Sequence, residues 1–517
     1  MVAEQAVLAP RSRRQRASQA VIDVLIALVV GAVAIVAIIF LPPIVAGGIL
    51  LVAGALFLLR RLVFNWTTML FLLAAVILFI PIRRYALPIS VGFELEPYRV
   101  AIAVLIVAVA IALANKRTFP WQPVLWGWPI AIFLWTQLAS LMFNIIYLTE
   151  TGLVTAGFSN IFQLAFLLST VVIFRQLLRR EIVVIAFLNF IVYAGAIIGF
   201  FAFVERVTRQ NVFLQLQNFL PLVLLRDDAE SVRAGGNRAF ASSQHPIALS
   251  VLFCLIIPIA IYLMKYSPWP RFAFTRKLVY SACIGVMLVG LLSAVSRTGI
   301  VVAGVMFVLC LLLRPKLALT IAALALPIVI IVALILPDLF ASTVGTLLDP
   351  AALIAGQFSS VGLPGQGRLA DLPEAFTQVA QHPWTGSGIG SRIVVGEHAN
   401  SQILDNQWLG SLLETGVLGI LGLVALLGWP TIAMLRFAFT SNAPDSRKFL
   451  AFAVATSTVG YITSMFFYDA FAFMQTLLML SILYAVAAWA MTDGAENWKA
   501  VTPRIPCLLY TSPSPRD

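Results

Sequence analysis

Long apolar runs constrain this chain more than any other feature of its sequence. A helix needs about 20 apolar residues to cross the hydrocarbon core of a bilayer, and runs of that kind recur along the whole chain. No water is available there to pair with backbone groups, so each run is expected to form a helix. The candidate spans cover residues 19–40, 43–60, 63–81, 98–115, 124–147, 157–176, 182–204, 246–265, 278–295, 298–314, 317–336, 408–430, 450–470 and 472–491. Two pairs of neighbouring spans, near residues 40 and 470, are so closely spaced that we predict about twelve to fourteen membrane helices.

The overall composition supports the same class of fold. Hydrophobic residues make up 61% of the 517 residues and charged residues 11%, and the mean hydropathy is +0.98. Soluble domains are about a quarter charged, so the sequence predicts an all-α polytopic membrane protein in a lipid bilayer. A net charge of +12 would favour nucleic-acid binding in a soluble protein. Here the basic residues form short clusters between spans, without interleaved aromatic residues, and we exclude nucleic acid as a partner.

The four cysteines give no sign of a disulfide framework. Cys254, Cys283 and Cys310 lie inside apolar runs, where a thiol packs as a small hydrophobic group. No predicted loop holds a pair of cysteines, so neither a disulfide nor a cysteine-based metal site is expected.

The last residues, 507–517, read CLLYTSPSPRD and resemble a translated sequencing adapter. We set them apart from the fold as an artefact, with an ordinary tail as the alternative.

The distribution of lysine and arginine predicts the orientation in the membrane. Cytoplasmic loops carry an excess of these residues, and RSRRQR precedes the first span. Residues 1–18 should therefore form a basic cytoplasmic tail. Later basic clusters fall on alternate loops, in agreement with fourteen spans and two cytoplasmic ends. Arg83 and Arg84 are the exception, because they fall on the outer side and indicate either binding residues or an error in the number of spans.

Two long polar segments lie on the outer side of this arrangement. The first covers residues 205–245, and its middle, NVFLQLQNFLPLVLL, could form an amphipathic helix on the membrane surface. The second covers residues 337–407 and separates the helices of 19–336 from those of 408–491, after which 492–517 form a cytoplasmic tail. Within the second segment, DLPEAFTQVAQ has a proline at a helix start. The glycine-rich turn HPWTGSGIG follows it.

Cations and imidazoles gather on the same outer side. All three histidines, His245, His382 and His398, fall in the two outer segments. Several arginines do so as well, and Arg297 lies in a very short outer turn, SAVSRTGI. A departing diphosphate needs cations, for which arginine is suited, and an attacking hydroxyl needs a base. The arrangement suggests a reaction on a phosphorylated lipid, without a metal or cofactor because arginines can carry the charge.

Each of these residues also has a purely structural interpretation. An arginine at membrane depth is costly unless it is paired or lines a polar cavity, so we favour a functional role for Arg297 over snorkelling. Arg238 follows a Gly-Gly-Asn turn and is open to either interpretation, whereas Arg368 has the setting of a solvated loop charge. His245 and His382 each precede a proline and are expected to be structural, His245 as a helix cap.

Two further residues are candidates for acid–base roles. His398 is flanked by Glu397 and Asn400, and it is either a hydrogen-bonded loop residue or a base. Glu414 lies two turns into a predicted span, where an ionisable residue suggests a catalytic role. The alternative is that Glu414 holds the geometry of a loop or helix.

Taken in order, the polar motifs resemble those of the O-antigen ligase and O-antigen polymerase superfamily, which includes exopolysaccharide polymerases. GNRAFASSQHPIALS resembles the first arginine motif of that superfamily, and SRTGIVVAG resembles the second. GRLADLPEAFTQVAQHPWTGSGIG resembles the Arg…His-Pro motif of the large outer loop. DNQWLGSLLETGVLGILG resembles the entry to the next span. The resemblance covers residues 235–425.

This resemblance implies a GT-C-type membrane glycosyltransferase in the bacterial cytoplasmic membrane, with a periplasmic or extracellular large loop. Such enzymes move a glycan from an undecaprenyl-diphosphate carrier to a hydroxyl of an acceptor glycan or lipid, with inversion and without a metal. Other polysaccharide-assembly proteins could act as partners. By position, Arg238 and Arg297 would bind the diphosphate, with support from Arg368. The base of the ligases is a histidine in the last motif, where this chain has Asp405, so the base is Asp405, His398 or neither.

The aspartate at this position weakens a ligase assignment and favours a polymerase or a different acceptor. A transporter or flippase of lipid-linked saccharides is the alternative from another class. Transporters show ionisable residues near the midplane and repeated halves, whereas here the spans are nearly uncharged and the chemistry lies on one face. A relative that attaches glycans to protein or lipid stays open as a third interpretation.

Overall fold

The computed structural model describes residues 65–88, 94–114, 119–226, 232–233, 236–335, 372–392 and 405–492, with isolated residues between 337 and 364. The chain divides into two compact units, residues 1–72 and 73–517. Of the first unit, the structure describes only residues 65–72. The predicted spans 19–40 and 43–60 lie outside the described residues, as do Arg368 and His398.

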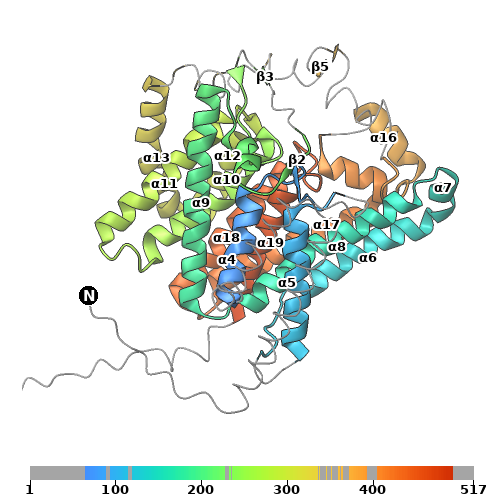
Figure 1. Cartoon of the computed structure of the whole chain (residues 1–517), viewed down its shortest axis with the longest axis horizontal. Coiled ribbons are helices and arrows are strands. Elements are labelled where there is room, and N and C mark those ends of the chain that lie inside the picture. Colours follow the sequence, from blue (N-terminus) through green and yellow to red (C-terminus); the bar gives the residue numbers. More distant parts are fainter. Residues whose placement is uncertain are drawn as a thin grey trace, which may run out of the picture. The chain divides into compact units, whose positions relative to one another are not determined.

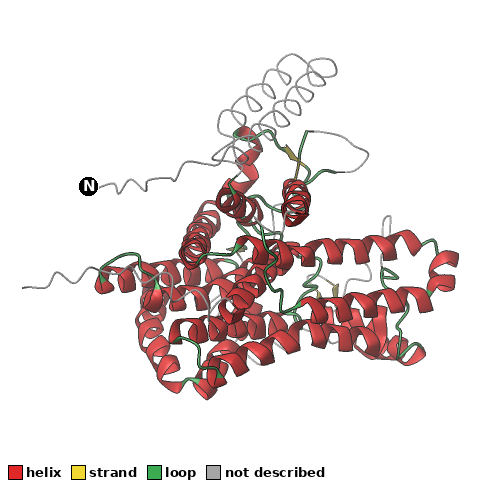
Figure 2. Cartoon of the chain, turned by 90° about the horizontal axis from the view of Figure 1, so that it is seen from below, coloured by secondary structure: helices red, strands yellow, loops and turns green. Residues whose placement is uncertain are grey.

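Helices make up nearly all of the described structure (Figure 1, Figure 2). Their bounds are α4 Trp66–Phe79, α5 Pro97–Ala114, α6 Gly127–Phe143, α7 Ile145–Glu150, α8 Val154–Leu177, α9 Glu181–Thr208, α10 Pro246–Tyr266, α11 Ala273–Ser293, α12 Arg297–Leu313, α13 Pro315–Ile335, α16 Leu372–Gln381, α17 Gln407–Thr440, α18 Asp445–Ser464 and α19 Met474–Thr492. Every predicted span from residue 63 onward coincides with a helix, although the run 124–147 breaks at Asn144 into α6 and α7. Among the described helices, seven are long and apolar enough to cross a membrane. The predicted all-α membrane fold is confirmed.

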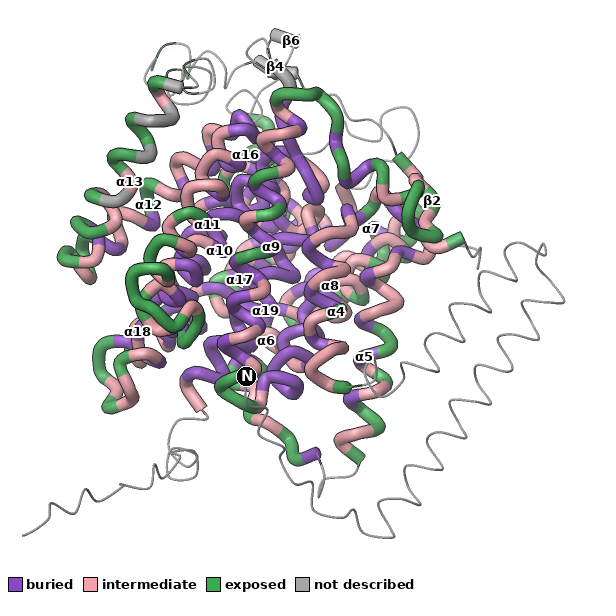
Figure 3. Tube along the Cα trace, turned by 60° about the vertical axis from the view of Figure 1, so that its left-hand side comes forward, coloured by how far each residue is buried: buried purple, intermediate pink, exposed green. Residues whose placement is uncertain are grey.

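Buried residues of the second unit are most frequent in α10, α18 and α19, and Figure 3 shows buried segments in purple. Helix α10 packs against α9, α11, α12, α18 and α19, and α19 also packs against α8. Nearly all residues of α10 and α19 are buried, whichever face of the helix they lie on. This is expected for helices that are apolar all round. Close approach between α10 and α12 depends on Gly299, because an added Cβ there would lie 2.7 Å from Cβ of Ser250. The first turn of α12 is thereby held against the first two turns of α10.

Short strand pairs tie the loops together. Strand β1, Tyr85–Ala86, pairs antiparallel with β2, Val223–Leu224. The others are β3 Val232–Arg233 with β4 Gly236–Asn237, and β5 Ser359–Ser360 with β6 Leu363–Pro364. The β1–β2 pair joins the turn after α4 to the loop after α9, two segments far apart in the sequence.

The two expected loop helices have different outcomes. Within NVFLQLQNFLPLVLL, residues Val212–Asn218 form a single 3-10 helix, η1, so a long amphipathic helix is wrong for this segment. The Asn211 side chain caps η1 by accepting a hydrogen bond from the Phe213 N–H at 2.8 Å. The helix predicted for DLPEAFTQVAQ is confirmed as α16, with Pro373 in its first turn.

Candidate functional site

Arg238 and Arg297 are brought to the same place by contacts between two turns. The Ala239 N–H donates to the carbonyl of Ser293 at 3.1 Å. Arg238 Nε donates to the carbonyl of Ala294 at 3.3 Å, and the Arg238 side chain is 7% exposed. Arg297 follows in the same turn as the first residue of α12. The two arginines predicted to bind diphosphate therefore lie on adjoining segments.

Several buried polar atoms in these two turns have no hydrogen-bond partner among the described residues. They are Ser242 Oγ, Gln244 Oε1, Ser296 Oγ and Arg297 Nη1. An unpaired buried donor or acceptor is costly in a folded protein. Unpaired buried polar atoms on these two adjoining segments, with half-buried Arg297 among them, are candidates for contacts with a polar ligand.

The segment that carries Arg238 is held by hydrogen bonds to Glu205, near the end of α9. Its buried carboxylate accepts hydrogen bonds from the Ala241 N–H at 2.8 Å and the Phe240 N–H at 3.3 Å. Asn211 donates to the Ala241 carbonyl at 2.9 Å. These contacts hold Ala241 at a positive φ of 47°, a conformation that a non-glycine residue adopts only when its surroundings require it.

Arg84 joins the same segment from the turn after α4. Its guanidinium carbon lies 4.5 Å from the ring centroid of Phe240, a cation–π distance. Arg84 is also close enough to Glu205 to attract its carboxylate. Arg84, one of the two arginines that were anomalous in the sequence, is thus next to the first arginine motif, which favours its interpretation as a binding residue.

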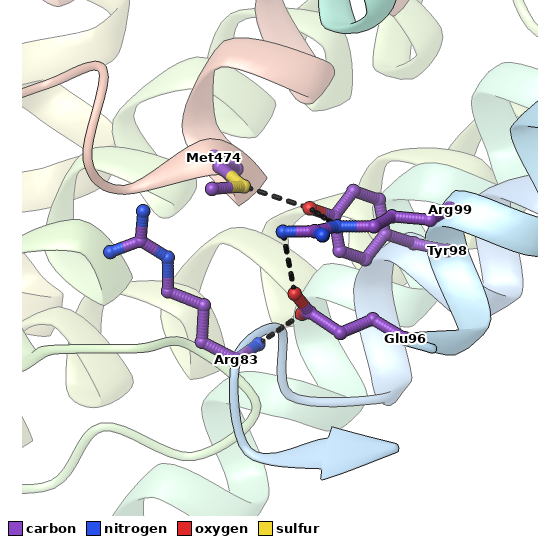
Figure 4. Close-up of polar contacts among 5 residues, drawn as sticks. All are labelled: Arg83, Glu96, Tyr98, Arg99 and Met474. Atoms are coloured by element: carbon purple, nitrogen blue, oxygen red, sulfur yellow. Dashed lines mark hydrogen bonds and ion pairs between the residues drawn. The ribbon is translucent and has the colours of Figure 1, made fainter. Parts of the chain in front are cut away.

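Arg83 is oriented by a separate polar cluster (Figure 4). Its backbone has a positive φ of 63°, and its N–H donates to Glu96 Oε2 at 2.7 Å. Arg99 pairs with Glu96 at 3.0 Å, and Tyr98 donates to the sulfur of Met474 at 2.9 Å. Burial raises the pKa of Glu96, and the Arg83 N–H and Arg99 lower it in part. The backbone N–H of Arg83 is used in this cluster, while its guanidinium points away from Glu96 and is exposed (Figure 4).

His245 is a helix cap, as expected. Its Nδ1 accepts a hydrogen bond from the Ile247 N–H at 3.2 Å at the start of α10. The imidazole also packs against the ring of Phe473, with centroids 5.5 Å apart. Ser243 donates to Gln475 Oε1 at 2.6 Å, so the segment before α10 is tied to the first turn of α19. The loop between α18 and α19 therefore borders the arginine site.

The glycine-rich turn HPWTGSGIG packs at a break in α17. Gly416 has φ 64° and ψ −161°, which interrupts the helical hydrogen bonding. The freed backbone groups pair with the turn: Val417 N–H with Pro383 O at 2.9 Å, Leu418 N–H with Trp384 O at 3.1 Å, Ser387 N–H with Leu413 O at 2.9 Å, and Gly388 N–H with Glu414 O at 2.8 Å. Ser140 of α6 adds a hydrogen bond to the Glu414 carbonyl at 3.0 Å. The HPWTGSGIG motif and the ETG motif are thus two halves of one backbone junction.

Glu414 has a clear structural role in this junction. Its carboxylate accepts backbone hydrogen bonds from Gly390 and Arg392 and is attracted by the Arg392 guanidinium. These contacts close the end of the glycine-rich turn over the break in α17. The geometric interpretation of Glu414 is therefore favoured over a role as a free acid or base.

Asp405 and Asp469 form the acidic side of the site. Asp405 is exposed, and it directly precedes Asn406, whose side chain caps α17 through the Leu409 N–H at 3.1 Å. Asp469 lies in the α18–α19 loop, close enough to Asp405 and Glu414 to repel both carboxylates. Gln407 fixes this loop by accepting from the Phe471 N–H at 2.9 Å.

Asp469 is a residue that the sequence interpretation missed. Burial raises the pKa of Asp469, and Asp405 raises it further, whereas two backbone N–H groups and the nearby Arg83 lower it. A carboxyl with a raised pKa beside a second carboxylate is characteristic of proton-transfer sites. The signal in the sequence was a single acid within FFYDAFAF, an apolar stretch at the end of the predicted span 450–470.

The other expected site residues are placed as follows. Arg368 and His398 lie outside the described residues, so their roles stay predictions. His382 is exposed, and its carbonyl accepts from the Gly386 N–H at 3.0 Å, in keeping with a structural role. Within the described part of the chain, no three histidine, cysteine, aspartate or glutamate side chains are grouped as metal ligands.

Comparison with known proteins bears on the same region. Residues 282–424 match the model of a protein family described as O-antigen ligase. The curated proteins contain no match. Arg297, Arg368, His398, Asp405 and Glu414 fall inside the matched residues, and Arg238 and Asp469 fall outside them.

Proposed function

On the premise that residues 282–424 are an O-antigen ligase domain of the ligase and polymerase superfamily, we propose the reaction of this integral membrane protein. It transfers a glycan from an undecaprenyl-diphosphate carrier to a hydroxyl of an acceptor sugar. The coarse activity, a membrane polysaccharide ligase or polymerase, follows from the family. The donor, the stereochemistry and the residues below are our proposal.

The observation that supports the donor most directly is the setting of Arg297. Its Nη1 is buried and unpaired among the described residues, and the Arg238 guanidinium is fixed at the turn just before it. Two guanidinium groups offer permanent charge and paired donors that suit phosphate oxygens. Arg84, over Phe240, supplies a third cation to the same segment.

The proposed chemistry is a single displacement at the anomeric carbon. The acceptor oxygen forms the new glycosidic bond as the bond from that carbon to the diphosphate oxygen breaks, which inverts the configuration. The hydroxyl proton passes to a base, and the lipid diphosphate leaves with its negative charge next to the arginines. Charge that develops on the leaving group is best stabilised by fixed cations. We expect the arginines to provide this stabilisation without a metal.

A carboxylate of the Asp405–Asp469 pair is the proposed base. The resemblance of the last motif gives Asp405 the position of the histidine in the ligases, and Asp469 is close enough to influence it. A base is most effective when its pKa is near the working pH, and burial moves the pKa of Asp469 in that direction. His398 is the remaining candidate.

The proposed location is the bacterial cytoplasmic membrane, with a cytoplasmic N-terminus and the Arg297 side facing outward. The basic loops favour this orientation. The favoured activity is polymerisation, because Asp405 replaces the histidine of the ligases. A transporter of lipid-linked saccharides is the competing function, and the experiment below distinguishes the two.

The test uses purified protein in vesicles with a lipid-diphosphate oligosaccharide and an acceptor. Transferase activity releases lipid diphosphate and lengthens the glycan. We expect Arg297→Ala to lower the rate by about 100- to 1000-fold, as loss of one group that stabilises developing charge does, and Arg297→Lys to retain part of it. Arg436→Ala, an exposed arginine at the far end of α17, is the control. An unchanged rate in Arg297→Ala contradicts the diphosphate role, and movement of intact substrate between leaflets without release supports a transporter.

A further inference from the structure

A large cavity lies between α10, α11, α12, α13 and α18. Its volume is about 1050 Å³, and its walls are mainly apolar side chains such as Ile257, Leu288 and Met306. That size lies at the upper end of pockets that enclose a whole organic ligand. Five basic residues also line it: Lys265, Arg276, Lys277, Arg314 and Lys316. No acidic residue is among the described residues that line it.

The basic end of the cavity is remote from the arginine site. Helix α10 begins after His245, beside Arg238, and runs for 21 residues to Tyr266, next to Lys265. That length is about 30 Å at 1.5 Å per residue, close to the thickness of the hydrocarbon core. Helix α12 likewise starts at Arg297 and ends just before Arg314. The two basic groups therefore lie at opposite membrane surfaces.

Arg314 is held rigidly at the edge of the cavity. Its guanidinium carbon lies near three phenylalanine rings: 4.8 Å from Phe452, 5.3 Å from Phe439 and 5.3 Å from Phe449. Arg314 Nε is buried and has no hydrogen-bond partner within the described part of the chain. A fixed guanidinium with an unused donor beside an apolar cavity is suited to a phosphate group that carries hydrocarbon chains.

Two carboxylates lie near this end among the described residues. Asp445, exposed at the start of α18, pairs with Lys448 at 3.0 Å and also attracts Lys265 and Arg314. Glu181, at the start of α9, is close enough to Tyr262 to act on it electrostatically. Two carboxylates cannot neutralise the five lining cations. The end of the cavity therefore keeps a marked positive charge, and a ligand there should be anionic.

We propose that the cavity binds an anionic phospholipid, with the phosphate at Arg314 and an acyl chain among the apolar side chains. The glycan donor is a poor occupant, because its diphosphate has to reach Arg297, about 25 Å away along α12. Free phosphate is also a poor occupant, because it would leave the apolar volume unfilled. In the proposed orientation the site faces the cytoplasmic leaflet, where anionic lipids attract basic clusters between helices. Lipid binding here does not depend on the transferase reaction.

Native mass spectrometry of the full chain tests this site. The protein is taken from vesicles of phosphatidylglycerol mixed equally with phosphatidylcholine, and the retained lipids are counted. We expect preferential retention of one phosphatidylglycerol. Arg314→Gln should reduce that preference about tenfold, the effect of one charge-assisted hydrogen bond. Arg436→Gln, which removes a charge near the same membrane surface without lining the cavity, should leave the preference unchanged.

A second variant guards against misfolding of Arg314→Gln. Lys277 and Lys316 are exposed, so Lys277→Gln with Lys316→Gln removes two lining charges with little change in packing. It should also lower the phosphatidylglycerol preference. Equal retention of the two lipids by the unmodified chain, or an unchanged preference in both variants, would overturn the proposal. The proposal would also be overturned if inorganic phosphate raised the melting temperature of the protein as much as phosphatidylglycerol does.

Discussion

Asp469 lies where the α18–α19 loop meets the start of α17, and its environment suggests a specific dependence of activity on pH. Burial holds its pKa above the usual range of an aspartate, with a further rise from Asp405. A base acts only when deprotonated. If Asp469 accepts the proton, activity falls as the pH drops through this raised pKa, at a higher pH than an ordinary aspartate would give.

Three variants identify the base. Asp469→Asn should lower kcat/KM by about 100-fold or more if Asp469 takes the proton, and the acid limb of the pH–rate profile should disappear or move to lower pH. Asp405→Asn and His398→Ala are measured beside it, with lipid-diphosphate release as the readout. A full loss in Asp405→Asn with the acid limb of Asp469→Asn retained would assign the base to Asp405. If all three variants stay active, this side of the site only positions the loop.

The arginines and carboxylates differ in how far the sequence could predict them. Arg297 could be predicted from the sequence, because it is an ionisable residue between two apolar runs and belongs to one of the motifs that occur in the same order as in the superfamily. The proximity of Arg84 to Phe240 could not be predicted, because it depends on the pairing of β1 with β2 across more than a hundred residues of chain. Asp469 was missed for a similar reason, since its neighbour Asp405 precedes it by two membrane helices.

At the scale of elements, the helices follow directly from the apolar runs, but the break in α17 does not. Gly416 stands within an apolar run that would form a continuous helix by itself. The break is stable because residues 383–388 supply partners for the freed backbone groups. These partners lie in another segment of the chain, so the sequence of the helix alone does not predict the break.

Gly416→Ala tests the importance of this junction. A φ of 64° with a ψ of −161° is essentially restricted to glycine, and an added Cβ would clash with the carbonyl group of Trp384. We expect a loss of about 3 kcal/mol or more in stability, seen as a lower melting temperature in detergent, together with loss of transfer. Gly410→Ala is the control on the same helix, since no atom lies within 4 Å of its added Cβ. Equal stability of the two variants would argue against the junction.

At the scale of the whole molecule, α17 fixes the relation between the two membrane surfaces. The part of α17 after its break is joined to the glycine-rich turn, because the Leu418 N–H donates to the Trp384 carbonyl. Its end packs with the end of α12 and the start of α13 in a cluster of Ala438, Cys310 and Ala318. From residue 418 to Arg436 the helix rises about 27 Å, nearly the thickness of the hydrocarbon core. His382 and Arg436 should therefore face opposite sides of the membrane.

Labelling of single cysteines with a membrane-impermeant thiol reagent tests this arrangement. Cys254, Cys283 and Cys310 are buried, and Cys507→Ser removes the fourth thiol. His382→Cys should react in intact cells, because the large loop faces outward in the proposed orientation. Arg436→Cys should react only after the membrane is permeabilised, because it follows the membrane-crossing part of α17 and lies near Arg314 and Lys316. Reaction of both from outside would contradict the crossing by α17, and the reverse pattern would place the arginine site in the cytoplasm, where an outward-facing polymerisation reaction could not occur.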